Sequence, residues 1–100
     1  VSDNRLGGWY SYRASKAAVN QVVRTFDNYL RDSAGPRAVA VGLHPGTVRT
    51  GLSRGFWGSV RPESLFEAEW VAERLVEVVR QRGAEGRGRC WDWGGREVLP

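Results

Sequence analysis

Apolar side chains recur at helical spacing in the first third of the chain. They lie three or four residues apart with polar residues between them, so they form one stripe along a helix. The members of this stripe are Val19, Val22, Val23, Phe26 and Leu30. The pattern predicts a helix from Tyr10 to Arg31, which Gly35 and Pro36 end because neither residue continues a helix easily.

A second stripe predicts another helix, from Glu67 to Gln81. Its apolar members are Ala68, Val71, Ala72, Leu75, Val78 and Val79. Glutamate and arginine occupy the remaining positions, as expected of a helix with one side in water.

Two short apolar segments have the composition of strands. Residues 37–43 are mostly small or β-branched and barely alternate with polar residues, which is typical of a strand covered on both faces. Residues 88–93 predict a last strand. Residues 47–61 contain three glycines among apolar side chains and predict an irregular, mobile loop.

The predicted order is helix, strand, loop, helix, strand. A strand, a helix and a second strand in succession form a β-α-β unit with parallel strands and a right-handed crossover. Two strands do not make a stable sheet. The pattern therefore predicts the end of a larger α/β sheet.

The composition of the 100 residues is that of one small globular domain, with 41% hydrophobic and 26% charged residues. The net charge is +4, but the arginines are spread along the chain among acidic residues and no groove-reading motif accompanies them, so we expect no nucleic-acid partner. No apolar run approaches the ~20 residues that span a bilayer, so we expect no membrane association. The only histidine and cysteine, His44 and Cys90, cannot build a metal site together.

Two features bear on the origin of the chain. A single cysteine forms no internal disulfide, which agrees with a cytoplasmic location. The chain contains no methionine and begins in a polar stretch, so we interpret it as part of a longer parent protein.

The segment Tyr12–Lys16, which reads Tyr-Arg-Ala-Ser-Lys, carries the clearest chemistry. Residues four apart share one face of a helix, so Tyr12 and Lys16 can address one site together. The pKa of a phenol lies near 10, and lowering it by two to three units requires about 3–4 kcal/mol. One ammonium ~4 Å away, at an effective dielectric near 20, supplies about 4 kcal/mol. The spacing alone is a weak signal, since a solvated lysine near an exposed tyrosine gives the same pattern.

Two motifs in order make the signal stronger. The segment Tyr12–Asn20 resembles the active-site signature of the short-chain dehydrogenase/reductase family, and His44–Thr50 resembles its proline–glycine motif. The approach Gly7–Ser11 and the ending Cys90–Gly95 are similar to one branch, the C-factor and sniffer-like carbonyl reductases. The resemblance covers essentially the whole chain and implies the C-terminal portion of a Rossmann-type doubly wound parallel sheet.

The resemblance implies an NAD(P)-dependent oxidoreductase that reduces a carbonyl or oxidises an alcohol. Tyr12 would donate or accept the proton, and Lys16 would lower the Tyr12 pKa and hydrogen-bond the nicotinamide ribose. The cofactor, NADP or NAD, would be contacted by Tyr12, Lys16, Pro45, Gly46, Val48 and Thr50. The partners would be that cofactor and a small carbonyl or alcohol substrate, in a parent protein that is a candidate homo-oligomer.

Residues 52–60 would form a lid over the substrate, with Phe56 and Trp57 as apolar contacts. For Trp9, which precedes the catalytic helix, substrate contact and plain packing are equally open.

Several family features do not occur in this sequence. They are the glycine-rich turn after the first strand, the catalytic serine and the catalytic asparagine. The resemblance places them before Val1, so residues 1–100 would form the C-terminal part of a single domain without its N-terminal cofactor-binding half. We expect this chain alone to be inactive. Epimerisation or dehydration on the same scaffold, and a non-catalytic interaction module, remain alternatives.

Overall fold

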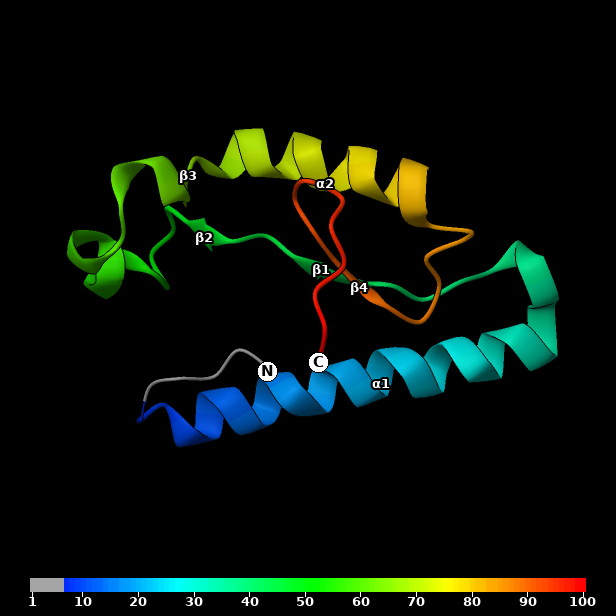
Figure 1. Ribbon diagram of the computed structural model, residues 1–100. Helices are drawn as coiled ribbons and strands as arrows, with labels where there is room; N and C mark the ends of the chain where they lie inside the picture. The colour runs from blue at the N-terminus through cyan, green and yellow to red at the C-terminus, as the bar shows by residue number, and fades with distance from the viewer. Residues whose placement is uncertain (1–6) are drawn as a thin grey trace.

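The computed structural model describes residues 7–100. Two helices enclose a thin layer of short strands, with α1 along one side and α2 along the other (Figure 1). The α-helices are α1 Tyr10–Ala34 and α2 Ala68–Arg82, and the strands are β1 Gly42–His44, β2 Thr47–Val48, β3 Leu65–Phe66 and β4 Cys90–Asp92. Short 3₁₀ turns occur at η1 Gly35–Arg37, η2 Arg54–Ser59 and η3 Pro62–Ser64.

The strands form two parallel pairs. β1 pairs with β4, with Gly42 opposite Cys90 and His44 opposite Asp92. Because α2 lies between these strands in sequence, β1, α2 and β4 form the predicted β-α-β unit. β2 pairs with β3 and so closes the base of the loop between them. The sequence predicted no strand there, because two-residue strands are too short to show alternation.

The helices lie where the pattern predicts them, but the strands are shorter than predicted. α1 begins at Tyr10 and continues past Arg31 to Ala34, where Gly35 adopts a φ of 57° and ends it. The predicted strand over 37–43 is confined to Gly42–His44, because its partner β4 is only three residues long. Leu43 is 38% exposed, so this strand is not covered on both faces within the described residues, and its expected burial in a larger sheet stays a prediction.

The apolar stripe of α1 also differs from the expected buried face. Its members Val19, Val22 and Phe26 are about half exposed or more. The side of α1 that packs inward instead carries Asp27, which is 1% exposed. The stripe members Val23 and Leu30 are half-buried on this side, so the predicted period is correct but only part of the stripe contacts the rest of the chain.

Asp27 joins three segments that are distant in sequence. The Arg87 Nε donates to both of its carboxylate oxygens, at 2.8 and 3.1 Å. The backbone N–H of Ala40 donates to the same carboxylate at 2.9 Å. The remaining guanidinium nitrogens of Arg87 donate to the carbonyls of Gly35 and Ala38, at 3.0 and 3.2 Å. One buried carboxylate thus fixes α1 against the segments that lead into β1 and β4.

Burial alone would raise the pKa of Asp27, but hydrogen bonds from Arg87 and Ala40 outweigh it and hold the pKa below its ordinary value of 3.8. A carboxylate with a depressed pKa stabilises the folded state above the pKa it has when unfolded. That contribution is lost as the pH falls through the folded pKa.

The hydrophobic core of the described residues is small. It consists of Val71 and Val78 from α2 and Trp91 from β4. The Trp91 indole donates to the Gly86 carbonyl at 3.0 Å, so its buried polar atom is satisfied. The chain exposes 7573 Å², whereas a compact protein of 11.2 kDa exposes about 5,700 Å². Neither described helix is long and apolar enough to cross a membrane.

We predict that the 100-residue chain expressed by itself is poorly folded, because both helices leave apolar side chains uncovered and the sheet is small. Urea denaturation followed by tryptophan fluorescence should give a broad transition or none, and nicotinamide cofactor should not change it. A monomer that unfolds in one steep transition would contradict this prediction and favour a self-sufficient interaction module.

We predict that Asp27→Asn lowers the stability of the protein that contains this chain by about 3–5 kcal/mol at neutral pH, because Arg87 is left buried without its partner. The wild type should lose stability as the pH falls below 3.8, and the variant should lose less. The measurement is the urea midpoint by circular dichroism at pH 7 and pH 3. Asp32→Asn, on an exposed position of the same helix, is the control and should leave both midpoints nearly unchanged.

Candidate functional site

The predicted Tyr12 and Lys16 pair lies in the first turns of α1. The Lys16 Nζ is 5.7 Å from the centroid of the Tyr12 ring, so the two side chains share one face of the helix as predicted. Tyr12 is 55% exposed and Lys16 is exposed as well. The pair is therefore open to a ligand.

The start of α1 is held in an unusual conformation. Trp9, the residue before the helix, has φ 61° and ψ 35°, which is left-handed backbone. Arg13 fixes this turn, since its N–H donates to the Trp9 carbonyl at 2.8 Å and its Nε donates to the Gly8 carbonyl at 3.1 Å. The orientation of the Tyr12 turn is thus set by Arg13 and not by a side-chain cap.

The proline–glycine turn follows β1 directly. Gly46 has φ 74°, and a Cβ at this position would lie 2.8 Å from the Phe66 ring and 3.2 Å from the Trp93 ring. Only glycine fits there, for both conformational and steric reasons. The turn lets the chain leave β1 and enter β2, which carries Thr47 and Val48.

Ser53 organises the loop that follows β2. Its hydroxyl donates to the Val48 carbonyl and accepts the N–H of Thr50 at 3.2 Å. It also accepts the Trp57 indole N–H at 2.9 Å. One hydroxyl therefore joins the end of β2 to the loop and to η2.

Trp57 lies against arginines and not beside Tyr12. The guanidinium of Arg49 is 5.3 Å from its ring centroid, and that of Arg54 is 5.9 Å away. Arg49 also pairs with Glu67 at 3.2 Å, next to the start of α2. These contacts hold the Trp57 side chain in place, so Trp57 anchors the loop.

Trp9, in contrast, lies next to Tyr12 and also contacts Phe56. The Trp9 and Phe56 ring centroids are 4.7 Å apart, and the Trp9 and Tyr12 centroids are 5.9 Å apart in an edge-to-face arrangement. We call Trp9, Tyr12 and Phe56 the aromatic cluster. It joins the loop to the first turn of α1.

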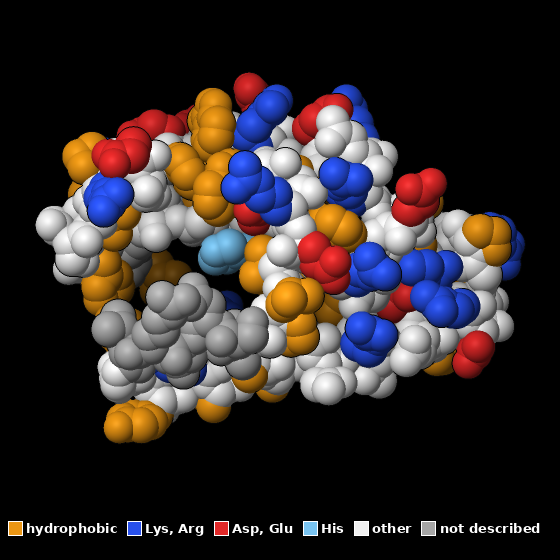
Figure 2. Space-filling view, in the orientation of Figure 1, with side chains coloured by type: hydrophobic (Ala, Val, Ile, Leu, Met, Phe, Trp, Pro, Cys, Tyr) orange, Lys and Arg blue, Asp and Glu red, His pale blue; other side chains and the backbone are white. Residues whose placement is uncertain are grey.

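The parts of the site lie at one end of the molecule. The start of α1, β2 and the η2 loop are all at the left in Figure 1, and Figure 2 shows the surface hollowed there beside the histidine. In parallel α/β sheets, ligands bind beyond the carboxyl ends of the strands, and β1 ends at His44 in this region. The site is therefore where the fold class predicts it.

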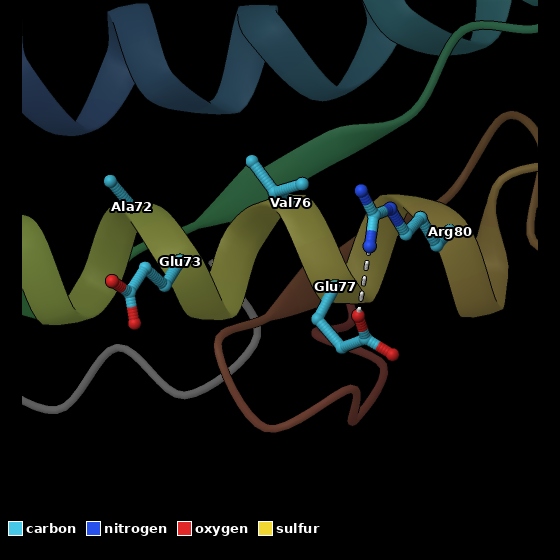
Figure 3. A pocket seen from close by; sticks show the side chains of 5 residues that line it. All are labelled: Ala72, Glu73, Val76, Glu77 and Arg80. Carbon is cyan, nitrogen blue, oxygen red and sulfur yellow. Dashed lines mark ion pairs between the residues drawn. The ribbon is translucent and has the colours of Figure 1, made fainter.

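A shallow groove on the outer surface of α2 contains none of the predicted site residues. It is lined by Ala72, Glu73, Val76, Glu77 and Arg80 (Figure 3). Glu77 and Arg80 form an ion pair of 3.8 Å across its floor. Within residues 7–100, no group of histidine, cysteine and acidic side chains could hold a metal ion.

Comparison with known proteins finds two relatives of similar sequence. No family model matches the chain. It is 35% identical over 98 residues to C-signal of Myxococcus xanthus, and 36% identical over 89 residues to 1-hydroxy-2-glutathionyl-2-methyl-3-butene dehydrogenase of Rhodococcus sp. (strain AD45). These alignments cover 98% and 89% of the chain, but 53% and 37% of the two relatives. The chain thus spans about half the length, or less, of the curated relatives it matches.

A solved structure is also similar to the chain. The NADPH-bound carbonyl reductase from chicken fatty liver superposes on 94% of the chain with a TM-score of 0.78 and 26% sequence identity, and the match covers 34% of that protein. The fold is thus the C-terminal portion of a Rossmann-type parallel sheet. The two relatives and this structure together support the C-terminal part of a protein of the short-chain dehydrogenase/reductase family.

Sequence reasoning missed Asp27 and Ser53. In the sequence, Asp27 is one of the polar residues that separate the apolar positions of the first helix, and no local pattern links it to Arg87, which is 60 residues away. Ser53 lies in a glycine-rich loop where any serine can form a local turn. Only the tertiary structure shows that the Ser53 hydroxyl donates a hydrogen bond to the Val48 carbonyl.

Proposed function

We propose that the protein containing this chain is an NAD(P)-dependent oxidoreductase that reduces a carbonyl compound or oxidises the corresponding alcohol. The observation that carries the proposal is the exposed Tyr12 and Lys16 pair at the start of α1, with Nζ 5.7 Å from the ring centroid. Its relatives include a dehydrogenase and a carbonyl reductase solved with NADPH.

The chemistry of the pair fits this reaction. A reduced nicotinamide bound near Tyr12 and Lys16 would supply the hydride that the carbonyl carbon accepts. The Tyr12 hydroxyl gives its proton to the carbonyl oxygen, so an alcohol forms and a phenolate remains. The ammonium of Lys16 would lie near that phenolate as its countercharge, and the phenolate would regain a proton from solvent.

The backbone of β2 suits the nicotinamide carboxamide. The Arg49 N–H donates to the Phe66 carbonyl of β3 at 2.9 Å. Successive N–H groups along a strand point to opposite edges, so the Val48 N–H points away from β3. It would donate to the carboxamide oxygen, while Pro45 and Gly46 shape the turn beside the ring and Thr50 contacts the carboxamide or the diphosphate.

The loop residues divide into two roles. Trp9 lies beside Tyr12, Phe56 contacts Trp9, and both are about half exposed, so they would contact the substrate. Trp57, held by Ser53 and two arginines, is better suited to anchoring the loop than to the substrate contact expected for it.

A non-catalytic interaction module is the second candidate. It is favoured by the similarity of nearly the whole chain to a protein named C-signal, and by the exposed apolar stripe of α1. In that case Tyr12→Phe would leave function intact, since the phenolic proton would have no role.

We predict that Tyr12→Phe lowers the carbonyl reductase kcat of the protein by about 10²–10⁴-fold, because the ring is kept and the transferred proton is lost. The assay follows NADPH oxidation at saturating carbonyl substrate. Tyr10→Phe removes the hydroxyl of an 83% exposed neighbouring tyrosine and should leave kcat unchanged. Near-normal turnover in Tyr12→Phe would show that the proton comes from another group.

We predict that Lys16→Arg lowers kcat and also weakens NADPH binding, although the charge is kept. A planar guanidinium is larger and more rigid than an ammonium, so it cannot take the same place beside the phenol and the ribose. Steady-state kinetics and NADPH fluorescence titration measure the two effects. Arg24→Lys, at an exposed position of α1, is the reciprocal control. Kinetics equal to those of the wild type would make Lys16 a solvated helix residue.

A further inference from the structure

Ser53 is half-buried in a loop that is otherwise exposed. Among residues 51–59, only Ser53 and Trp57 are partly covered, and the other seven are exposed. The two side chains meet, since the Trp57 indole N–H donates to the Ser53 hydroxyl at 2.9 Å. The side of the loop that faces the rest of the molecule is therefore formed by this pair.

The hydroxyl of Ser53 uses its full hydrogen-bonding capacity. A serine hydroxyl has one proton to donate and two positions that accept. Its proton goes to the Val48 carbonyl, while the Thr50 carbonyl at 3.3 Å is a more distant acceptor. It accepts the backbone N–H of Thr50 at 3.2 Å and the indole N–H of Trp57. Ser53 therefore acts by holding these neighbouring groups together and not by contacting a substrate.

Two of the three groups belong to the edge of β2 where we expect the nicotinamide. The Arg49 N–H donates to the Phe66 carbonyl of β3, and the polar groups of the preceding strand residue point to the opposite edge. The Val48 carbonyl that Ser53 holds thus lies on the same edge as the Val48 N–H, which would take the carboxamide. Ser53 fixes this edge at the carbonyl and leaves that N–H to the cofactor.

The third group belongs to the loop. The Trp57 indole lies against the guanidinium groups of Arg49 and Arg54, so the part of η2 around it follows the position of the indole. The backbone of Ser53 also begins η2, since the Phe56 N–H donates to the Ser53 carbonyl at 2.9 Å. One hydroxyl therefore connects the β2 edge directly to the loop.

We propose, on the basis of the proposed function, that Ser53 is a positioning residue that couples nicotinamide binding at Val48 and Thr50 to the placement of the loop over residues 52–60. A cofactor held at the β2 edge fixes the backbone groups that Ser53 contacts, and the hydroxyl in turn fixes the Trp57 indole. Such coupling is reciprocal, so a loop that is held through Ser53 also strengthens cofactor binding. Ser53 itself takes no part in proton or hydride transfer.

The test uses the protein that contains this chain, with NADPH or NADH, whichever the wild type binds more tightly. Fluorescence titration gives the dissociation constant of the cofactor. The second quantity is the rate of tryptic cleavage after Arg54, an exposed residue of η2, with and without saturating cofactor. In the wild type the cofactor should slow this cleavage at least about 5-fold, the lower end of typical coupling between two sites. In Ser53→Ala the cofactor should bind at least about 5-fold more weakly and, at saturation, should no longer slow the cleavage.

Three further variants separate coupling from folding. Ser53→Thr keeps the hydroxyl and should retain most of both effects. Trp57→Phe keeps a ring but removes the indole N–H, so it breaks the same connection from the side of the loop. The double variant Ser53→Ala/Trp57→Phe should therefore bind the cofactor about as tightly as Ser53→Ala alone. Ser33→Ala is the control and should change neither quantity, because its hydroxyl donates to the Tyr29 carbonyl on α1.

Three results would overturn this inference while Tyr12→Phe still lowers kcat and the proposed function stands. They are a wild-type dissociation constant in Ser53→Ala, cleavage of Ser53→Ala that the cofactor still slows, and additive losses in the double variant. The first result together with a lower urea midpoint would show a merely structural role. A wild type that binds neither cofactor, with no effect of Tyr12→Phe on any measured activity, would instead overturn the proposed function and this inference with it.

Discussion

The buried carboxylate of Asp27 is the constraint on which the rest of the structure depends. It accepts hydrogen bonds from Arg87 and from the backbone of Ala40, while Arg87 also donates to two carbonyls that follow α1. A buried charge with 1% exposure requires pairing and hydrogen bonds, so this carboxylate holds the three segments together. Because the hydrophobic core is small, this polar connection sets the angle at which α1 meets the sheet.

That angle has a consequence at the other end of α1. The helix is 25 residues long, and its last turns are fixed by Asp27 while its first turns present Tyr12 and Lys16. A helix is nearly rigid over this length, at ~1.5 Å per residue, so fixing one end positions the other. The contacts of Asp27 and the candidate site are thus separate in space but are linked through α1.

The other side of the site is formed by the turn after β1 and by the loop between β2 and β3. The Phe66 and Trp93 rings leave no room for a side chain at Gly46, whose positive φ lets the chain turn from β1 into β2. The short β2 and β3 pair then closes the base of the loop, and Ser53 fixes its interior. Phe56 reaches Trp9 because all of these contacts hold the loop in place.

The sequence by itself determined the two helices, the β-α-β order, the parallel pairing and the Tyr12 and Lys16 pair, because each depends on spacing within one or two elements. It also placed the proline–glycine turn correctly. The tertiary structure alone decided which side of α1 packs inward, since an amphipathic period fixes a stripe but not its partner, and Asp27 took the inward position. It likewise decided the β2 and β3 pair, the role of Ser53 and the separation of Phe56 from Trp57, because these depend on contacts between segments that no local pattern connects.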